Sequence, residues 1–260
     1  MTALPALLRL PRLAWLALTL PALASAGGGA EAPVPTFRAD YEIRINGFGV
    51  GRATFTLERM ADGSYLYRQR SRPTGLASWF RRQRVHESSR WRLVGDTLQP
   101  LEYFYSRSGA DERTVELLFD WPAGQVENRV QGKPWRMDIP PGTLDKLLVQ
   151  IALLLDLRRG ATRFDYAVAD GGRLKHFAFE VVDEETIELP AGTWRALRVR
   201  RLDDGGQRTL VWVAPALGYL PVRFVKHRRN GLKYEMRLLS LDEHRPADAP
   251  RLETPAPAPH

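Results

Sequence analysis

Histidines and acidic residues are the parts of this chain whose types could support acid–base or metal chemistry. His86 precedes Glu87, and an imidazole beside a carboxylate is a common general acid–base pair. In a strand, however, adjacent side chains point to opposite faces, so these two would not meet. No two histidines have the helical spacing of metal ligands. The five histidines are His86, His176, His227, His244 and His260.

Other catalytic signatures are missing from the sequence. It contains no Gly-x-Ser-x-Gly elbow, His-Glu-x-x-His motif, phosphate-binding loop or calcium loop. The absence of cysteine excludes thiolate metal sites, cysteine nucleophiles and thiol redox chemistry. We therefore predict a protein that is not an enzyme, with no metal, no cofactor and no catalytic residue. A hydrolase whose site the sequence does not reveal is kept as an alternative.

Aromatic side chains near arginines indicate a second kind of chemistry, the binding of an amphiphile. The aromatic residues either fill the core and pair across strands or line a hydrophobic cavity for an acyl chain. In the second interpretation, arginines would pair with an anionic head group. The predicted ligand contacts are Leu76, Trp79, Phe80, Tyr103, Leu148, Leu155 and Trp212, and the predicted head-group contacts are Arg81, Arg82 and Arg84.

Apolar and polar residues alternate along most of the chain, which is the pattern of half-buried strands. Tyr41, Ile43 and Ile45 alternate with polar residues, and Asn230-Gly231 is a strong hairpin signal. We predict a mainly β protein with a single antiparallel curved sheet or incomplete barrel of about ten to twelve strands. By the same alternation, Trp212 should face the core or cavity, with Val211 and Val213 on the opposite face.

One segment breaks this alternation and predicts a helix over residues 144–158. Thr143 can cap it, Asp145 lies in its first turn, and Gly160 follows as a stop. The segment is apolar nearly all round, so we expect it to be buried inside the curved sheet. It is too short to span a bilayer easily, and we predict no membrane span in the mature chain.

The first 26 residues predict export. Arg9 and Arg12 precede an apolar run, and Ala24-Ser25-Ala26 matches the site after which signal peptidase cuts. Cleavage after Ala26 removes two arginines and no acid, so the net charge falls from +8 to +6. Export argues against a nucleic-acid partner for this basic chain. The predicted organisation is a signal peptide at 1–26, a flexible lead-in at 27–36, one β domain at 37–242 and a disordered tail at 243–260.

The C-terminal third carries a family resemblance. Pro190-Ala191-Gly192-Thr193-Trp194, Trp212-Val213-Ala214-Pro215 and Gly218-Tyr219-Leu220-Pro221-Val222 occur in this order. They resemble the exported bacterial family called domain of unknown function 3108, and the resemblance covers residues 37–241. The Trp, Pro and Gly-Leu-Pro order before an Asn-Gly hairpin is also similar to periplasmic lipoprotein carriers. That similarity implies an incomplete barrel with helices over its mouth and acyl chains in its cavity.

These inferences lead to one functional hypothesis and an alternative. We expect a periplasmic protein of the Gram-negative cell envelope that binds a lipid, a lipidated ligand or another amphiphilic envelope molecule, or assists envelope assembly. The alternative is an interaction module with a filled core that scaffolds an envelope protein through an exposed sheet edge. A cavity large enough for a chain-like ligand would favour the first hypothesis.

Overall fold

The computed structural model describes residues 34–75, 83–109, 112–202 and 206–244. Within them lie fifteen strands of one sheet and one α-helix, which confirms a mainly β fold with a single helix. The strand count exceeds the predicted ten to twelve because short strands carry little alternation. The elements are β1 (Thr36–Ile45), β2 (Phe48–Arg59), β3 (Tyr65–Pro73), β4 (Arg84–Val94), β5 (Thr97–Ser108), β6 (Arg113–Asp120), β7 (Gln125–Val130), β8 (Lys133–Asp138), β9 (Leu144–Asp145), α2 (Val149–Arg158), β10 (Arg163–Ala169), β11 (Leu174–Leu189), β12 (Gly192–Arg201), β13 (Arg208–Ala214), η1 (Pro215–Leu217), β14 (Leu220–His227) and β15 (Lys233–His244).

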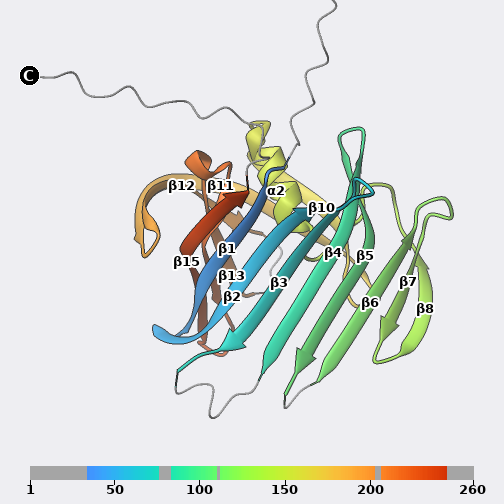
Figure 1. Cartoon of the computed structure of the whole chain (residues 1–260), viewed down its shortest axis with the longest axis horizontal. Coiled ribbons are helices and arrows are strands. Elements are labelled where there is room, and N and C mark those ends of the chain that lie inside the picture. The colour runs from blue at the N-terminus through green and yellow to red at the C-terminus, as the bar shows by residue number, and fades with distance from the viewer. Residues whose placement is uncertain (1–33, 76–82, 110–111, 203–205, 245–260) are drawn as a thin grey trace, which may run out of the picture. The chain divides into compact units, whose positions relative to one another are not determined.

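The strand order forces the sheet to curl. β1 pairs with β15 in the middle of the sheet, and the edges are β8 and β9. Residues 139–143 join these two edges, a connection that reaches at most about 22 Å. Fifteen strands laid flat would hold the edges about 67 Å apart. The sheet therefore winds back on itself without closing, and β9 lies against β5. Figure 1 shows β1 to β8 side by side across one face.

The inner face of the sheet, against which α2 packs, holds an aromatic core. Tyr41 and Phe55 meet edge to face with ring centroids 5.3 Å apart, and Tyr65 stacks on Trp91 at 4.5 Å. The Tyr41 hydroxyl donates to the Pro221 carbonyl oxygen at 2.6 Å, which joins β1 to the start of β14. These rings fill the core and pair across strands, as one of the two predicted interpretations of the aromatic residues requires.

Both edges of the sheet are poor templates for another strand. β9 has only two residues, and β8 carries Pro134, which lacks a backbone donor, between Lys133 and Arg136. An interaction module working through edge pairing would need a longer edge that is free to hydrogen-bond. These edges therefore do not favour the alternative hypothesis of an interaction module that binds its partner through a sheet edge.

Helix α2 begins later than predicted. Leu144 and Asp145 form β9, which pairs in parallel with β10, so they do not belong to the helix. Thr143 is not its cap, because its hydroxyl donates to the Pro140 carbonyl oxygen at 2.7 Å. The prediction missed this because a lone pair of strand residues has no periodicity. Gly160, with φ of +82°, follows the helix as expected.

The helix is buried on nearly every side, as its sequence predicts. Seven of its ten residues are buried, and its single basic residue in the last turn, Arg158, donates to the Gly218 carbonyl oxygen at 3.1 Å. The Tyr67 hydroxyl donates to the Gln150 side-chain oxygen at 3.0 Å, which fixes α2 against the inner face of β3. No helix in the described part of the chain is long and apolar enough to cross a membrane.

The predicted terminal segments lie mostly outside the described residues. The signal peptide at 1–26 and residues 245–260 of the tail are outside them. At the domain boundaries, Val34 is buried and β1 begins at Thr36, inside the predicted lead-in. β15 runs to His244, two residues into the predicted tail.

The turn between β10 and β11 packs against the edge strand β8. Gly171 and Gly172 join β10 to β11, and a Cβ atom added to Gly172 would lie 1.7 Å from the Trp135 ring of β8. Gly172 has φ of +88°, which disfavours any side chain. The edge strand β8 therefore packs on this turn, and only glycine leaves room for the indole.

We expect Gly172→Ala to destabilise the protein by about 2 kcal/mol, because it adds a steric clash to the cost of a positive φ. Gly63→Ala is the matched control, since Gly63 has φ of +81° with open space around its Cβ position. It should cost only about 1 kcal/mol. Urea unfolding of both variants measures the difference in stability. Equal losses of stability would contradict the packing of Trp135 against Gly172.

Candidate ligand-binding site

An apolar hollow of about 620 Å³ lies on the inner face at the end of the sheet away from α2. The curl of β1 to β5 brings its walls together, and alternation places every second residue of each strand inward. Phe48 lines the hollow and is 76% exposed, so the hollow reaches solvent at the β1–β2 hairpin. The apolar lining residues are Ile43, Ile45, Phe48, Val50, Pro73, Val85, Tyr105 and Tyr234.

A second hollow of about 470 Å³ adjoins the first and is strongly basic. Both hollows are lined by Tyr105 and Arg107, which are adjacent inward positions of β5. Asp170 is the one acid in the basic lining, and it pairs with Lys175 at 2.6 Å. The basic residues lining this hollow are Arg107, Arg113, Lys146, Arg173 and Lys175.

Lys146 connects the basic hollow to a buried polar cluster. Its ammonium lies 4.8 Å from the centre of the Tyr105 ring and 3.3 Å from the Glu87 carboxylate. Burial alone would lower the pKa of Lys146, but the nearby carboxylates of Glu87 and Asp170 outweigh it and raise that pKa above its usual value. Lys146 is therefore positively charged at neutral pH and can attract an anion.

The polar cluster anchors the segment before α2 to the sheet. Glu87 accepts a hydrogen bond from the Tyr103 hydroxyl at 2.6 Å. Asp145 is fully buried. Its carboxylate accepts a hydrogen bond from the Ser89 hydroxyl at 2.5 Å and from the backbone N–H groups of Leu147 and Leu148 at 2.9 and 2.8 Å. Burial raises the pKa of Asp145 from 3.8 to about 7. This arrangement is structural, because each carboxylate is already occupied by protein partners.

His86 and Glu87 do not meet, as the strand alternation predicts. Glu87 points inward to Tyr103, whereas His86 lies on the outer face, where its ring meets Phe104 edge to face at 5.7 Å. The strand alternation expected for these neighbours is confirmed. Within the described residues, no three histidine or acidic side chains are grouped so as to hold a metal ion.

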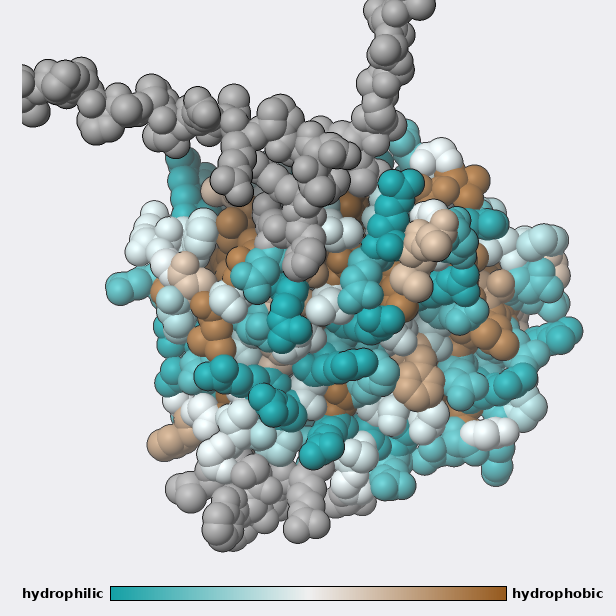
Figure 2. Space-filling view, in the orientation of Figure 1, coloured by the Kyte–Doolittle hydropathy of each residue, from teal (hydrophilic) through white to brown (hydrophobic). Residues whose placement is uncertain are grey.

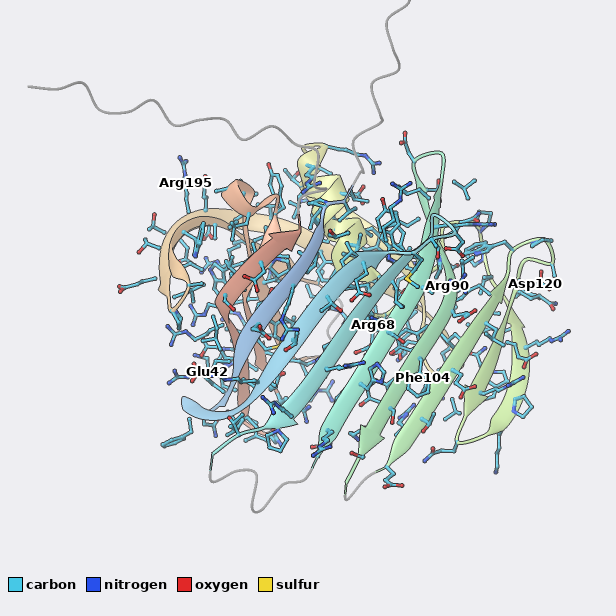
Figure 3. The ribbon with its side chains drawn as sticks, in the orientation of Figure 1. Glu42, Arg68, Arg90, Phe104, Asp120 and Arg195 are labelled. Atoms are coloured by element: carbon cyan, nitrogen blue, oxygen red, sulfur yellow. The ribbon has the colours of Figure 1, made fainter. Side chains whose placement is uncertain are left out.

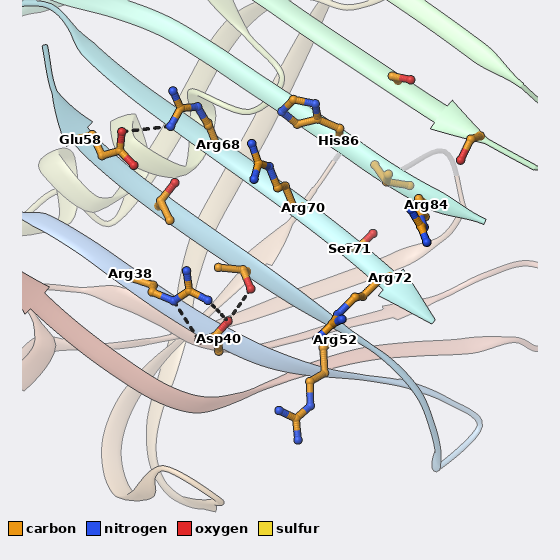
Figure 4. A pocket seen from close by; sticks show the side chains of 15 residues that line it. Arg38, Asp40, Arg52, Glu58, Arg68, Arg70, Ser71, Arg72, Arg84 and His86 are labelled. Atoms are coloured by element: carbon orange, nitrogen blue, oxygen red, sulfur yellow. Dashed lines mark hydrogen bonds and ion pairs between the residues drawn. The ribbon is translucent and has the colours of Figure 1, made fainter. Parts of the chain in front are cut away.

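The outer face of β1 to β5 carries a polar groove of about 860 Å³. Figure 4 shows its arginines projecting from adjacent strands, and Figure 3 shows Arg68 and Phe104 on the same face. Hydrophilic residues predominate across this side of the protein in Figure 2, with hydrophobic ones scattered between them. The charged residues lining the groove are Arg38, Asp40, Arg52, Glu58, Arg68, Arg70, Arg72 and Arg84, with His86 beside them.

The predicted site residues that the structure describes do not form a single site. Tyr103 lines the basic hollow, and Arg84 lines the outer groove. Leu148 and Leu155 are buried in the core, at 0% and 7% exposure. Leu76, Trp79, Phe80, Arg81 and Arg82 lie outside the described residues.

Trp212 is buried but lines none of these hollows. Its indole N–H donates to Glu185 at 2.6 Å, and the guanidinium of Arg223 lies 4.7 Å from its ring. The strand register places it in a cross-strand row with Arg198 and Arg223. Val211 lies in the neighbouring row, with Val199 and Phe224. The core packing of Trp212 therefore involves charged partners that the sequence pattern does not reveal.

Sequence reasoning missed the residues that join the two hollows. Tyr105 and Arg107 follow Tyr103 at intervals of two, so the alternation of β5 could have placed all three on one face. Lys146, Arg113 and Arg173 come from other segments, and only the curl of the sheet brings them beside β5.

Together, the curled sheet, the buried helix and the inner hollows define an open, β-barrel-like antiparallel protein. The chain belongs to the family described as "Protein of unknown function (DUF3108)", whose model matches residues 40–237. This confirms the resemblance inferred from the C-terminal motifs. No curated protein sequence matches the chain.

One solved structure shares this fold, and two others are less similar. A β-barrel-like protein of domain of unknown function DUF1849 from Brucella abortus has a TM-score of 0.54 at 12% identity, covering 82% of this chain and 99% of its own. A candidate lipoprotein of Parabacteroides distasonis has a TM-score of 0.35 at 10% identity, with 81% and 96% covered. A candidate exported protein of Bacteroides fragilis with a YmcC-like fold has a TM-score of 0.35 at 10% identity, with 79% and 95% covered.

Proposed function

We propose that this protein is a periplasmic, non-enzymatic binder of an anionic amphiphile in the cell envelope. The observation that carries the proposal is the junction of an apolar hollow and a basic hollow at Tyr105 and Arg107. An acyl chain would occupy the apolar part, and its acidic head group would face Arg107 and Lys146. Each hollow by itself falls within the size range of small-molecule sites.

The charge distribution supports an anionic head group. The basic hollow has five basic residues and one acid in its lining, and Lys146 is also held near the aromatic ring of Tyr105. A neutral hydrocarbon would gain nothing from this excess of positive charge. An amphiphile with a carboxylate or phosphate satisfies both parts of the site at once.

The location and the absence of catalysis are part of the same proposal. The basis for export is the signal-peptide pattern of residues 1–26. The basis for a binding role without chemistry is that Glu87 and Asp145 are engaged in anchoring contacts and are separated from His86 by the sheet.

We expect Val50→Asp to weaken binding of a fluorescent fatty acid at least tenfold, because a charge would be placed in the apolar hollow. Val94→Asp is the matched control, since Val94 is 48% exposed and lines none of the hollows described. It should bind like the wild type. Fluorescence titration of the exported protein without detergent measures both affinities.

Arg107→Gln tests the contact with the acidic head group separately from the contact with the acyl chain. This variant should weaken the binding of a fatty acid more than the binding of the corresponding fatty alcohol, whose head group is neutral. Equal affinity of the wild type and Val50→Asp for the fatty acid, or wild-type protein that binds neither probe, would contradict the proposal.

A further inference from the structure

Three arginines form a row across adjacent strands at the end of the outer groove away from α2. Arg52 of β2 lies directly opposite Arg72 of β3. The β3–β4 register pairs Ser71 with Val85, and its next step places Arg72 beside Arg84. Like charges directly opposite each other in a sheet destabilise it. The row therefore favours binding of an external anion.

The neighbouring carboxylates are engaged elsewhere. In the same groove, Asp40 pairs with Arg38 at 3.3 Å and Glu58 pairs with Arg68 at 3.0 Å. Glu42, which lies opposite Arg52, pairs with Arg44 at 3.3 Å.

Across the described part of the chain, no carboxylate lies within ion-pair distance of Arg52, Arg72 or Arg84. The positive charge of the row is therefore not compensated by the described protein, and all three side chains belong to exposed residues.

The arginine row adjoins the opening of the apolar hollow. Ser71, Arg72 and Val85 line both the outer groove and the apolar hollow. Phe48, which is 76% exposed, stands at the same end and also lines the hollow. An uncompensated basic row beside a protruding aromatic ring matches the phosphate layer and the apolar boundary of a lipid bilayer.

We propose that this end of the sheet docks on an anionic phospholipid bilayer, with Arg52, Arg72 and Arg84 on lipid phosphates and Phe48 at the acyl boundary. Docking in this orientation places the opening of the apolar hollow against the membrane. The inference extends the proposed function from binding an amphiphile to the surface from which the amphiphile is taken or to which it is delivered.

Vesicle co-sedimentation tests the docking with the exported protein. Wild-type protein should bind phosphatidylglycerol–phosphatidylcholine vesicles, bind phosphatidylcholine vesicles weakly, and dissociate as salt is raised. The triple variant R52Q/R72Q/R84Q should lose about 100-fold in affinity, since each basic residue near an anionic surface contributes about fivefold. The control R59Q/R92Q/R163Q removes the same charge from exposed arginines elsewhere and should retain binding.

Equal binding by the two triple variants would overturn the proposal, as would wild-type binding that does not depend on phosphatidylglycerol. Phe48→Ser should weaken vesicle binding several-fold while leaving binding to soluble polyphosphate unchanged. If Phe48→Ser leaves vesicle binding intact and polyphosphate competes fully, the row is a site for a soluble polyanion and the membrane assignment is wrong.

The docking proposal and the ligand proposal can be tested independently of each other. Val50→Asp should weaken fatty-acid binding at least tenfold and leave vesicle binding unchanged. Fatty-acid binding that fails in the wild type while vesicle docking persists would overturn the ligand proposal alone.

Discussion

Leu148→Ala is expected to lower the free energy of unfolding by about 2–5 kcal/mol while leaving fatty-acid affinity unchanged. Leu148 is completely buried just before α2 and belongs to the hydrophobic core. Truncating it removes apolar contacts and leaves a cavity beside the polar cluster that anchors the helix. Urea unfolding measures the loss of stability, and fluorescence titration measures ligand affinity on the same protein.

This experiment separates two roles that sequence alone does not distinguish. The sequence predicts Leu148 as a ligand contact, and the structure places it in the protein core. Leu118→Ala is the control, because Leu118 is 42% exposed on β6 and its loss should cost less than 1 kcal/mol. A small change in stability together with a large fall in fatty-acid affinity would show that Leu148 contacts ligand after all.

Asp145 is expected to contribute more to the stability of the folded protein in mild acid than at alkaline pH. Burial raises the pKa of this carboxyl in the folded state from 3.8 to about 7. The folded protein therefore binds more protons than the unfolded chain between these two values. Over that window the Asp145 contribution falls as pH rises, by an amount on the order of a few kcal/mol, and above about pH 7 it is constant.

Asp145→Asn removes this titration while keeping the side-chain shape. Its oxygen can accept the N–H groups of Leu147 and Leu148, and its amide can donate to Ser89. The difference in unfolding free energy between this variant and the wild type should therefore shift in favour of the variant as pH is raised from 5 towards 8. Urea unfolding at several pH values follows this difference.

Asp145→Ala tests the anchoring contacts themselves. It leaves three buried donors without their acceptor, so it should be destabilised by about 3 kcal/mol or more at every pH. A difference between wild type and Asp145→Asn that is independent of pH would show that Asp145 does not titrate in this range. An Asp145→Ala variant as stable as the wild type would contradict the anchoring role.

The local features of the fold follow closely from the sequence. Alternation in segments such as Tyr41 to Ile45 identified long strands, and the apolar run after Leu147 identified a buried helix. The same alternation separated His86 from Glu87 correctly. It failed at Leu144 and Asp145, because their strand pairing with Val168 and Ala169 depends on residues more than twenty positions away.

The candidate site illustrates the same division. Tyr103 was identified from its type, and Tyr105 and Arg107 share its face by alternation alone. Lys146 and Arg113 join them only because residues 139–143 tie the two edges of the sheet together and bend it. Leu148 and Leu155 are apolar whether their partner is protein or ligand, so the pattern of apolar residues did not decide their role.

Strand alternation, a buried helix and the motifs of the family can all be inferred from the sequence, because they depend on neighbouring residues and short periodicities. The tertiary structure decided which strands meet, how the sheet curls, and that Arg52, Arg72 and Arg84 stand in one row. Those features depend on register between segments that are distant in sequence, where each pairing is set by the packing of the whole sheet.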